Sequence, residues 1–129
     1  MTEQASERGS LARTIARLLL AFIMVYAGVA HFRNPAPFIS IVPDWLPAHA
    51  ALVAISGVAE IAGGVGLLVP LVRLVAAIGL IALYIAVFPA NVYMLTHHIY
   101  MAGIHSDFWL WLRLPLQVVL IGWAWWVRR

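Results

Sequence analysis

The sequence contains no cysteine and no lysine, and the first absence excludes several kinds of chemistry. Without thiols the chain cannot hold a disulfide framework, a thiol redox pair or an iron–sulfur cluster of its own. Its basic residues are eight arginines, and charged residues make up only 10% of the chain. With a net charge of +3, so sparse a set does not form a nucleic-acid surface, and we expect no nucleic-acid partner.

Apolar residues dominate what is present. They make up 64% of the chain, and the mean hydropathy is +0.96, more than a water-soluble domain of 129 residues can bury. Four apolar segments each approach the roughly 20 residues that cross a hydrocarbon core of about 30 Å. They cover residues 11–32, 50–69, 73–95 and 108–127. The sequence therefore predicts an all-α integral membrane four-helix bundle, multi-pass in a cell inner or plasma membrane, with lipid as its immediate partner.

The connections support one domain over residues 11–129. Residues 1–10 are polar and predict a disordered cytoplasmic tail. Residues 34–47 contain four prolines and cannot form one continuous helix. Because Phe38, Ile41 and Trp45 need an apolar surface, we expect this segment to pack on the outer mouth of the bundle.

Arginine placement predicts the orientation. If the N-terminus is cytoplasmic, six arginines lie on that side and only Arg33 and Arg113 lie toward the other. This asymmetry follows the positive-inside rule, so both termini are predicted to be cytoplasmic. A cleaved signal peptide is an alternative interpretation of the first segment, because Arg13 and Arg17 precede its apolar run and small residues end it.

Polar residues inside the apolar segments are the candidate site. A charge in the middle of a span costs about 2.5–3.5 kcal/mol on insertion scales, so Glu60 should face protein or water. The other polar residues expected in the same outer layer are His31, Asn91, Tyr93, Arg113 and Gln117. We expect Glu60 and Arg113 to interact, directly or through Asn91 or a water. The layer is then either a structural lock on helix register or a ligand pocket.

The histidine-rich connection raises the question of a metal. His97, His98, His105 and Asp107 lie close together in the sequence, and all are residue types that bind zinc or copper. Their spacing matches no established metal motif, so a solvated loop is the interpretation we adopt and we predict no metal site. A haem held by His31 and His97 is a further alternative, disfavoured because both residues lie at segment ends.

Three blocks of residues resemble the DoxX family of small membrane proteins. The first runs from Gly28 to Phe32 and leads into the prolines, the second is the glycine-rich segment around Glu60, and the third is the run from Val87 to Asn91. The resemblance covers about half of the chain and implies a four-helix membrane bundle. Members of the wider family are associated with sulfur oxidation coupled to quinone, or with membrane redox complexes.

The resemblance suggests two functions. The chain could be a redox-associated or quinone-binding subunit that works with a redox partner protein or as a homo-oligomer. The alternative is a non-enzymatic bundle that binds a lipid or small solute, or that scaffolds partner proteins. The sequence contains no catalytic motif, so any redox activity would depend on partners.

Overall fold

The computed structural model describes residues 2–100 and 106–129, and within them all regular structure is helical. Its helices are α1 (Thr2–Arg33), α2 (Pro35–Ser40), α3 (His49–Leu68), α4 (Arg73–Thr96) and α5 (Asp107–Trp126). Four of these, all but α2, are long and apolar enough to cross a membrane. The last three lie within one residue of the predicted spans at both ends, which is the usual uncertainty of a helix end.

The first helix is longer than its predicted span. We predicted a disordered tail for residues 1–10, but α1 continues back to Thr2. The chain has no proline before Pro35, and its polar N-terminal residues include good helix formers such as Glu3 and Ala5. The Thr14 hydroxyl also donates a hydrogen bond to the Ser10 carbonyl, 2.9 Å away. The tail is therefore a solvated extension of the first helix.

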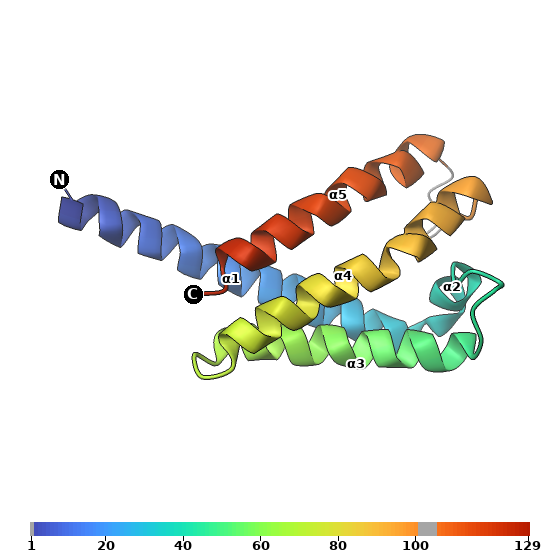
Figure 1. Ribbon diagram of the computed structural model, residues 1–129, viewed down its shortest axis with the longest axis horizontal. Helices are drawn as coiled ribbons and strands as arrows, with labels where there is room; N and C mark the ends of the chain where they lie inside the picture. The colour runs from blue at the N-terminus through green and yellow to red at the C-terminus, as the bar shows by residue number, and fades with distance from the viewer. Residues whose placement is uncertain (1, 101–105) are drawn as a thin grey trace.

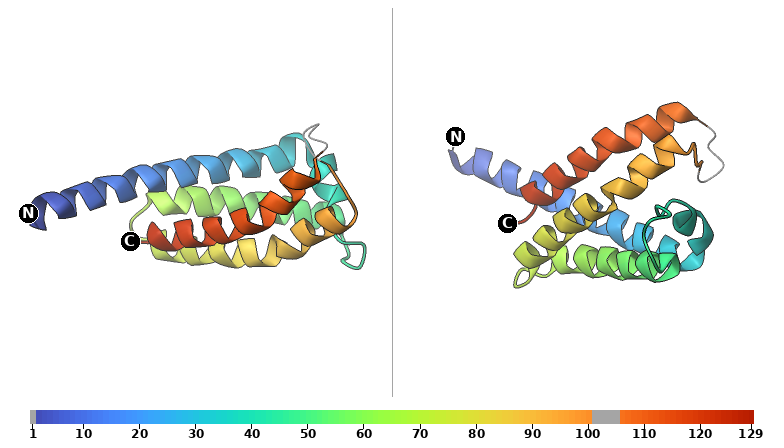
Figure 2. Two further views of the ribbon diagram at one scale, coloured as in Figure 1. Left: turned by 90° about the horizontal axis from the view of Figure 1, so that it is seen from above. Right: turned by 45° about the vertical axis from the view of Figure 1, so that its right-hand side comes forward.

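The long helices form a bundle that opens toward one end. Both chain termini lie at the same end, here called the terminal end; α2, the end of α4 and the start of α5 lie at the opposite loop end (Figure 1). Helix α3 packs between α1 and α4, and α5 packs along α4. Helices α1 and α5 cross near the terminal end and diverge toward the loop end (Figures 1 and 2).

Glycines set the close packing of α1 on α3. A Cβ atom on Gly28 would lie 2.7 Å from the Gly57 carbonyl oxygen, and one on Gly57 would lie 3.1 Å from the Gly28 carbonyl oxygen. Further along the two helices, a Cβ atom on Gly64 would lie 2.9 Å from the Ala21 carbonyl oxygen. Small residues let two helix backbones approach each other in lipid, where van der Waals packing drives association. These glycines, here called the glycine seam (Gly28, Gly57 and Gly64), fix the position of α1 along the axis of α3.

At the terminal end, polar contacts tie α1 to the end of α5. The Arg17 side chain, 8% exposed, donates from Nε to the Val127 carbonyl at 3.2 Å and from its guanidinium to the Arg129 carbonyl. The Trp123 indole donates to the Ala16 carbonyl at 3.0 Å. A cation near the C-terminal carbonyls of a helix satisfies acceptors that lack partners within the helix. Arg17 therefore caps α5.

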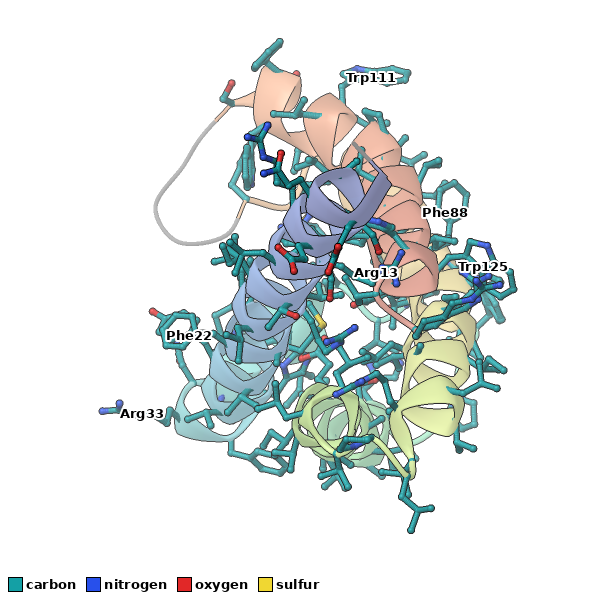
Figure 3. All side chains as sticks on the ribbon, turned by 90° about the vertical axis from the view of Figure 1, so that its left-hand side faces the viewer. Arg13, Phe22, Arg33, Phe88, Trp111 and Trp125 are labelled. Atoms are coloured by element: carbon teal, nitrogen blue, oxygen red, sulfur yellow. The ribbon has the colours of Figure 1, made fainter. Side chains whose placement is uncertain are left out.

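The exterior is apolar and aromatic. Phe22, Phe88, Trp111 and Trp125 point away from the bundle (Figure 3). More exposed hydrophobic residues lie along all four long helices than a water-soluble monomer of this size presents. Such a surface is stable in lipid, which supports a multi-pass membrane protein.

The prediction for the proline-rich segment, residues 34–47, is partly confirmed. It is not one continuous helix: α2 ends at Ser40, and residues 41–48 lead irregularly into α3. Ile41 is buried at 8% exposure, and the Phe38 ring stacks on His31 with 4.0 Å between ring centroids. Trp45 is 72% exposed, so the expectation that its side chain packs on the bundle is wrong. The segment does cover the end of α1, as predicted, but the indole of Trp45 remains on the surface.

Candidate functional site

The one acidic residue in the middle of a long helix pairs with a histidine. Glu60 of α3 places Oε2 3.3 Å from Nδ1 of His31 on α1, and their side chains are 15% and 11% exposed. The glycine seam positions this pair, because Gly28 and Gly57 bring the two backbones together within one turn of both residues. Phe38 of α2 covers the His31 ring from the loop end.

The Glu60 oxygen that faces His31 accepts no hydrogen bond from the described residues. His31 Nδ1 lies 2.7 Å from the Ala27 carbonyl, and because a carbonyl only accepts, this nitrogen carries the proton and donates there. Glu60 Oε2 is buried and has no hydrogen bond within the described chain. Most buried polar atoms are satisfied, so an exception suggests a role such as ligand or water binding. This oxygen is the clearest unsatisfied acceptor of the spans.

The predicted pairing of Glu60 with Arg113 is wrong. Among the described residues, no ion pair joins them, and Arg113 Nε donates to Asn91 Oδ1 at 3.3 Å. The positions of Glu60 and Asn91 along the bundle axis explain why Glu60 does not meet Arg113. A Cβ on Gly63 would lie 2.6 Å from Leu80 Cγ, which places Glu60 level with residues 83–84 of the antiparallel α4. Asn91 is seven residues further, about 10 Å along the helix.

A second polar cluster joins α4 to α5. Asn91 and Gln117, 7% and 5% exposed, hydrogen-bond through their side-chain amides, and Gln117 Nε2 donates to the Tyr84 carbonyl at 2.5 Å. With Arg113 on Asn91, the three side chains form one connected network. Unlike Glu60, the Asn91 and Gln117 amides are satisfied within the chain. This cluster is suited to holding two helices together in lipid.

Two prolines lie beside this network. Pro89 in α4 cannot donate to the Ile85 carbonyl, and the adjacent Tyr84 carbonyl is the one that accepts from Gln117. Pro115 in α5 lies between Arg113 and Gln117. Sequence reasoning did not single out Pro115. Its signal was a proline within a span, two positions from both Arg113 and Gln117.

The polar residues of the spans therefore form two groups rather than the single predicted layer. His31 and Glu60 make one group on α1 and α3. Asn91, Gln117 and Arg113 make the other on α4 and α5. The sixth predicted residue, Tyr93, belongs to neither group. Its ring stacks on His97, with 3.9 Å between centroids, at the loop end of α4.

A surface groove lies beside Tyr93. It has a volume of about 560 Å³ and runs between α4 and the segment that leads from α2 to α3. Its polar and aromatic lining comes from Asp44, Trp45, Phe88, Tyr93 and His97. Asp44 and Tyr93 both line the groove. Sequence reasoning missed this groove, because Asp44 and Tyr93 belong to segments that only the fold brings together.

The histidine-rich connection shows no metal centre in its described part. His98 Nδ1 lies 3.1 Å from Asp107 Oδ1, and both side chains are more than half exposed. Asp107 also accepts a hydrogen bond from Tyr100 at 2.8 Å, which raises the pKa of the Tyr100 hydroxyl. No group of three candidate metal ligands occurs among the described residues, and His105 lies outside them. His97 and His31 make separate contacts, to Tyr93 and Glu60, which gives the haem alternative no support.

Comparison with known proteins places the chain in a family without assigning it an activity. No curated protein and no solved structure matches it. Residues 20–128 match the family described as a domain of unknown function, DUF8561. The matched segment includes α1 from Leu20 onward, the other three long helices and both polar groups. The match covers far more than half of the chain, and the protein belongs to the DUF8561 family.

Proposed function

We propose that this protein is a membrane-embedded binding module in which the His31–Glu60 pair receives a hydrogen-bond-donating head group. The observation that carries the proposal is the buried Glu60 Oε2, which has no hydrogen bond within the described chain. Leaving a buried acceptor unpaired costs about 1–3 kcal/mol, and a ligand that donates to it recovers that cost. Both side chains remain slightly exposed, so a ligand in the bilayer would approach the pair from the lipid, and the side chains that cover Oε2 would have to move aside for it.

A quinone in its reduced form is the ligand class that we propose. Its hydroxyl would donate to Glu60 Oε2, and its apolar tail would lie among the lipid-facing side chains of the bundle. Support comes from the DoxX resemblance, whose Gly28–Phe32 and Glu60 blocks contain both residues of the pair. The protein would then serve a redox enzyme as a quinone-binding subunit, because its sequence holds no catalytic motif of its own.

We also propose the orientation and the membrane. The terminal end, with most of the arginines, faces the cytoplasm, and the loop end with the His31–Glu60 pair faces outward. The membrane would be a cell inner or plasma membrane. A head group would then enter from the outer leaflet.

Mass spectrometry of the purified protein tests the quinone proposal. The wild type, extracted in a mild detergent, should retain quinone in a near one-to-one ratio, and Glu60→Gln should lose most of it. Glu7→Gln, which changes an exposed acid of α1, is the control and should retain quinone like the wild type. Equal quinone in the Glu60 and Glu7 variants would place any bound quinone elsewhere.

A non-enzymatic bundle is the second candidate function. The observation that favours it is the satisfied Asn91–Gln117–Arg113 network, which binds helix to helix and needs no ligand. In this case the protein binds a lipid or small solute, or scaffolds a partner. Purified protein that carries phospholipid and no quinone would favour this function over the first.

A further inference from the structure

The groove at the loop end is a second candidate ligand site, remote from the His31–Glu60 pair. Its volume of about 560 Å³ falls within the range of small-molecule pockets. One wall is the last three turns of α4, from Phe88 to His97, and the other is the segment at Pro43–Trp45. No residue of the His31–Glu60 pair lines it.

The charged residues that line the groove indicate whether its ligand is a cation or an anion. Among the described residues that line the groove, Asp44 is the only acid and none is an arginine. Within the described chain no ion pair neutralises Asp44, since the ion pairs there engage Glu60 and Asp107. An acid without an ion-pair partner in the described chain attracts a cation and repels an anion.

The aromatic residues of the groove indicate which class of cation it would bind. Trp45, Phe88 and Tyr93 bring their rings to the groove, and His97 stacks on Tyr93 with an interplanar angle of 25°. The face of an aromatic ring attracts a cation, most strongly for tryptophan, and several rings together bind quaternary ammonium groups. A small hydrated metal ion would prefer a cluster of oxygen ligands, which this groove does not offer.

The groove is also graded from polar to apolar. Asp44, Thr96 and His97 line one part, and Phe88 and Val92 line the part deeper along α4. Phe88 and His97 are nine positions apart, about 14 Å along the helix. A ligand with a cationic head and an apolar chain would match both parts.

From these features we propose that the groove lined by Asp44, Trp45 and Tyr93 binds a trimethylammonium head group. The carboxylate pairs with the positive charge, the rings of Trp45 and Tyr93 contact the methyl groups, and Phe88 is left for the apolar chain. The head group can come from a free choline-like cation or from a phosphatidylcholine lipid. Both sources offer the same chemistry to the groove. The site is independent of the proposed quinone site.

Binding of choline to the full-length protein in detergent tests the charge requirement. Isothermal titration should detect choline and should find much weaker binding of 3,3-dimethylbutanol, which has the same shape without the charge. Asp44→Asn and Trp45→Ala should each weaken choline binding about tenfold, as the loss of a carboxylate or a desolvated cation–π contact predicts. Asp44→Glu retains the charge and should retain most of the binding.

Two matched controls separate the groove from the rest of the loop end. Asp107→Asn removes an exposed acid that contacts His98 and Tyr100 outside the groove, and Trp111→Ala removes an exposed tryptophan of α5. Neither should change choline affinity, and circular dichroism checks that each variant is folded. The proposal is overturned if choline does not bind, if the neutral alcohol binds equally well, or if the Asp107 change weakens binding as much as the Asp44 change.

Lipid retention distinguishes the two sources. The protein is reconstituted in nanodiscs that contain phosphatidylcholine and phosphatidylglycerol with identical chains, and retained lipid is measured by native mass spectrometry. Preferential phosphatidylcholine retention that Asp44→Asn abolishes identifies a lipid ligand. Choline binding without lipid preference identifies a soluble cation. Equal retention of both lipids together with no choline binding contradicts the proposal for either source.

Discussion

His31 Nδ1 on α1 and Glu60 Oε2 on α3 lie 3.3 Å apart, about one turn from the close approach of the two helices at Gly28 and Gly57. The pair is therefore held by backbone packing rather than by its own attraction. A charge pair on two long flexible side chains would lose more entropy on forming. Here the glycine seam has already placed the two residues side by side, and this arrangement makes the pair sensitive to changes in the seam.

Coupling between His31 and Glu60 should be measurable. Thermal unfolding in detergent of His31→Ala, Glu60→Gln and the double variant should give a coupling free energy of about 0.5–3 kcal/mol, the range for residues in contact. A parallel cycle with Arg113→Ala and Glu60→Gln should be additive within about 0.5 kcal/mol, because those side chains do not meet. Coupling in the second cycle and none in the first would contradict the pairing described above.

The glycine seam should tolerate no added methyl group. In Gly28→Ala, the new Cβ would lie 2.7 Å from the Gly57 oxygen, a backbone atom that cannot move aside alone. We expect destabilisation of about 1–3 kcal/mol, measured as a lower unfolding temperature in detergent. Gly122→Ala is the matched control, since nothing lies within 4 Å of its Cβ position and alanine favours the helix. Equal losses for both variants would mean that α1 and α3 do not pack at Gly28.

The α4–α5 network should show the penalty of leaving one partner unpaired. Gln117→Leu leaves Asn91 Nδ2 without its acceptor and removes the side-chain donor to the Tyr84 carbonyl, and should cost about 1–3 kcal/mol of unfolding free energy. The double variant Asn91→Leu with Gln117→Leu should cost less than the sum of the single changes. Thr96→Val, which removes an exposed hydrogen bond of α4, should have little effect. Strictly additive losses at Asn91 and Gln117 would contradict a shared network.

Reporter fusions should place both termini in the cytoplasm. The reason is the asymmetry of the arginines, six on the side of the termini and two on the other. A phosphatase that is active only outside should be inactive at either end, and a fluorescent protein that folds only in the cytoplasm should be bright at either end. An active phosphatase at one terminus would reverse the assignment of the His31–Glu60 pair to the outer leaflet.

The sequence by itself determined the number of helices long and apolar enough to cross a membrane, and the limits of the last three of them. Span length and apolar composition are local properties, and the bilayer imposes the same length on every segment. The prolines of residues 34–47 likewise excluded a continuous helix, because the missing N–H and the ring act within one turn. The error at residues 1–10 was of another kind: a polar sequence without prolines is compatible with both a tail and a solvated helix.

Only the tertiary structure decided which polar residues meet. The sequence placed Glu60, His31, Asn91, Tyr93, Arg113 and Gln117 in the outer half of the spans, but depth counted along separate helices does not give their relative height or rotation. Those depend on where small residues let the backbones touch, as at Gly28, Gly57 and Gly63. A shift of seven residues along α4, about 10 Å, was enough to give Glu60 a histidine partner and to leave Arg113 with Asn91.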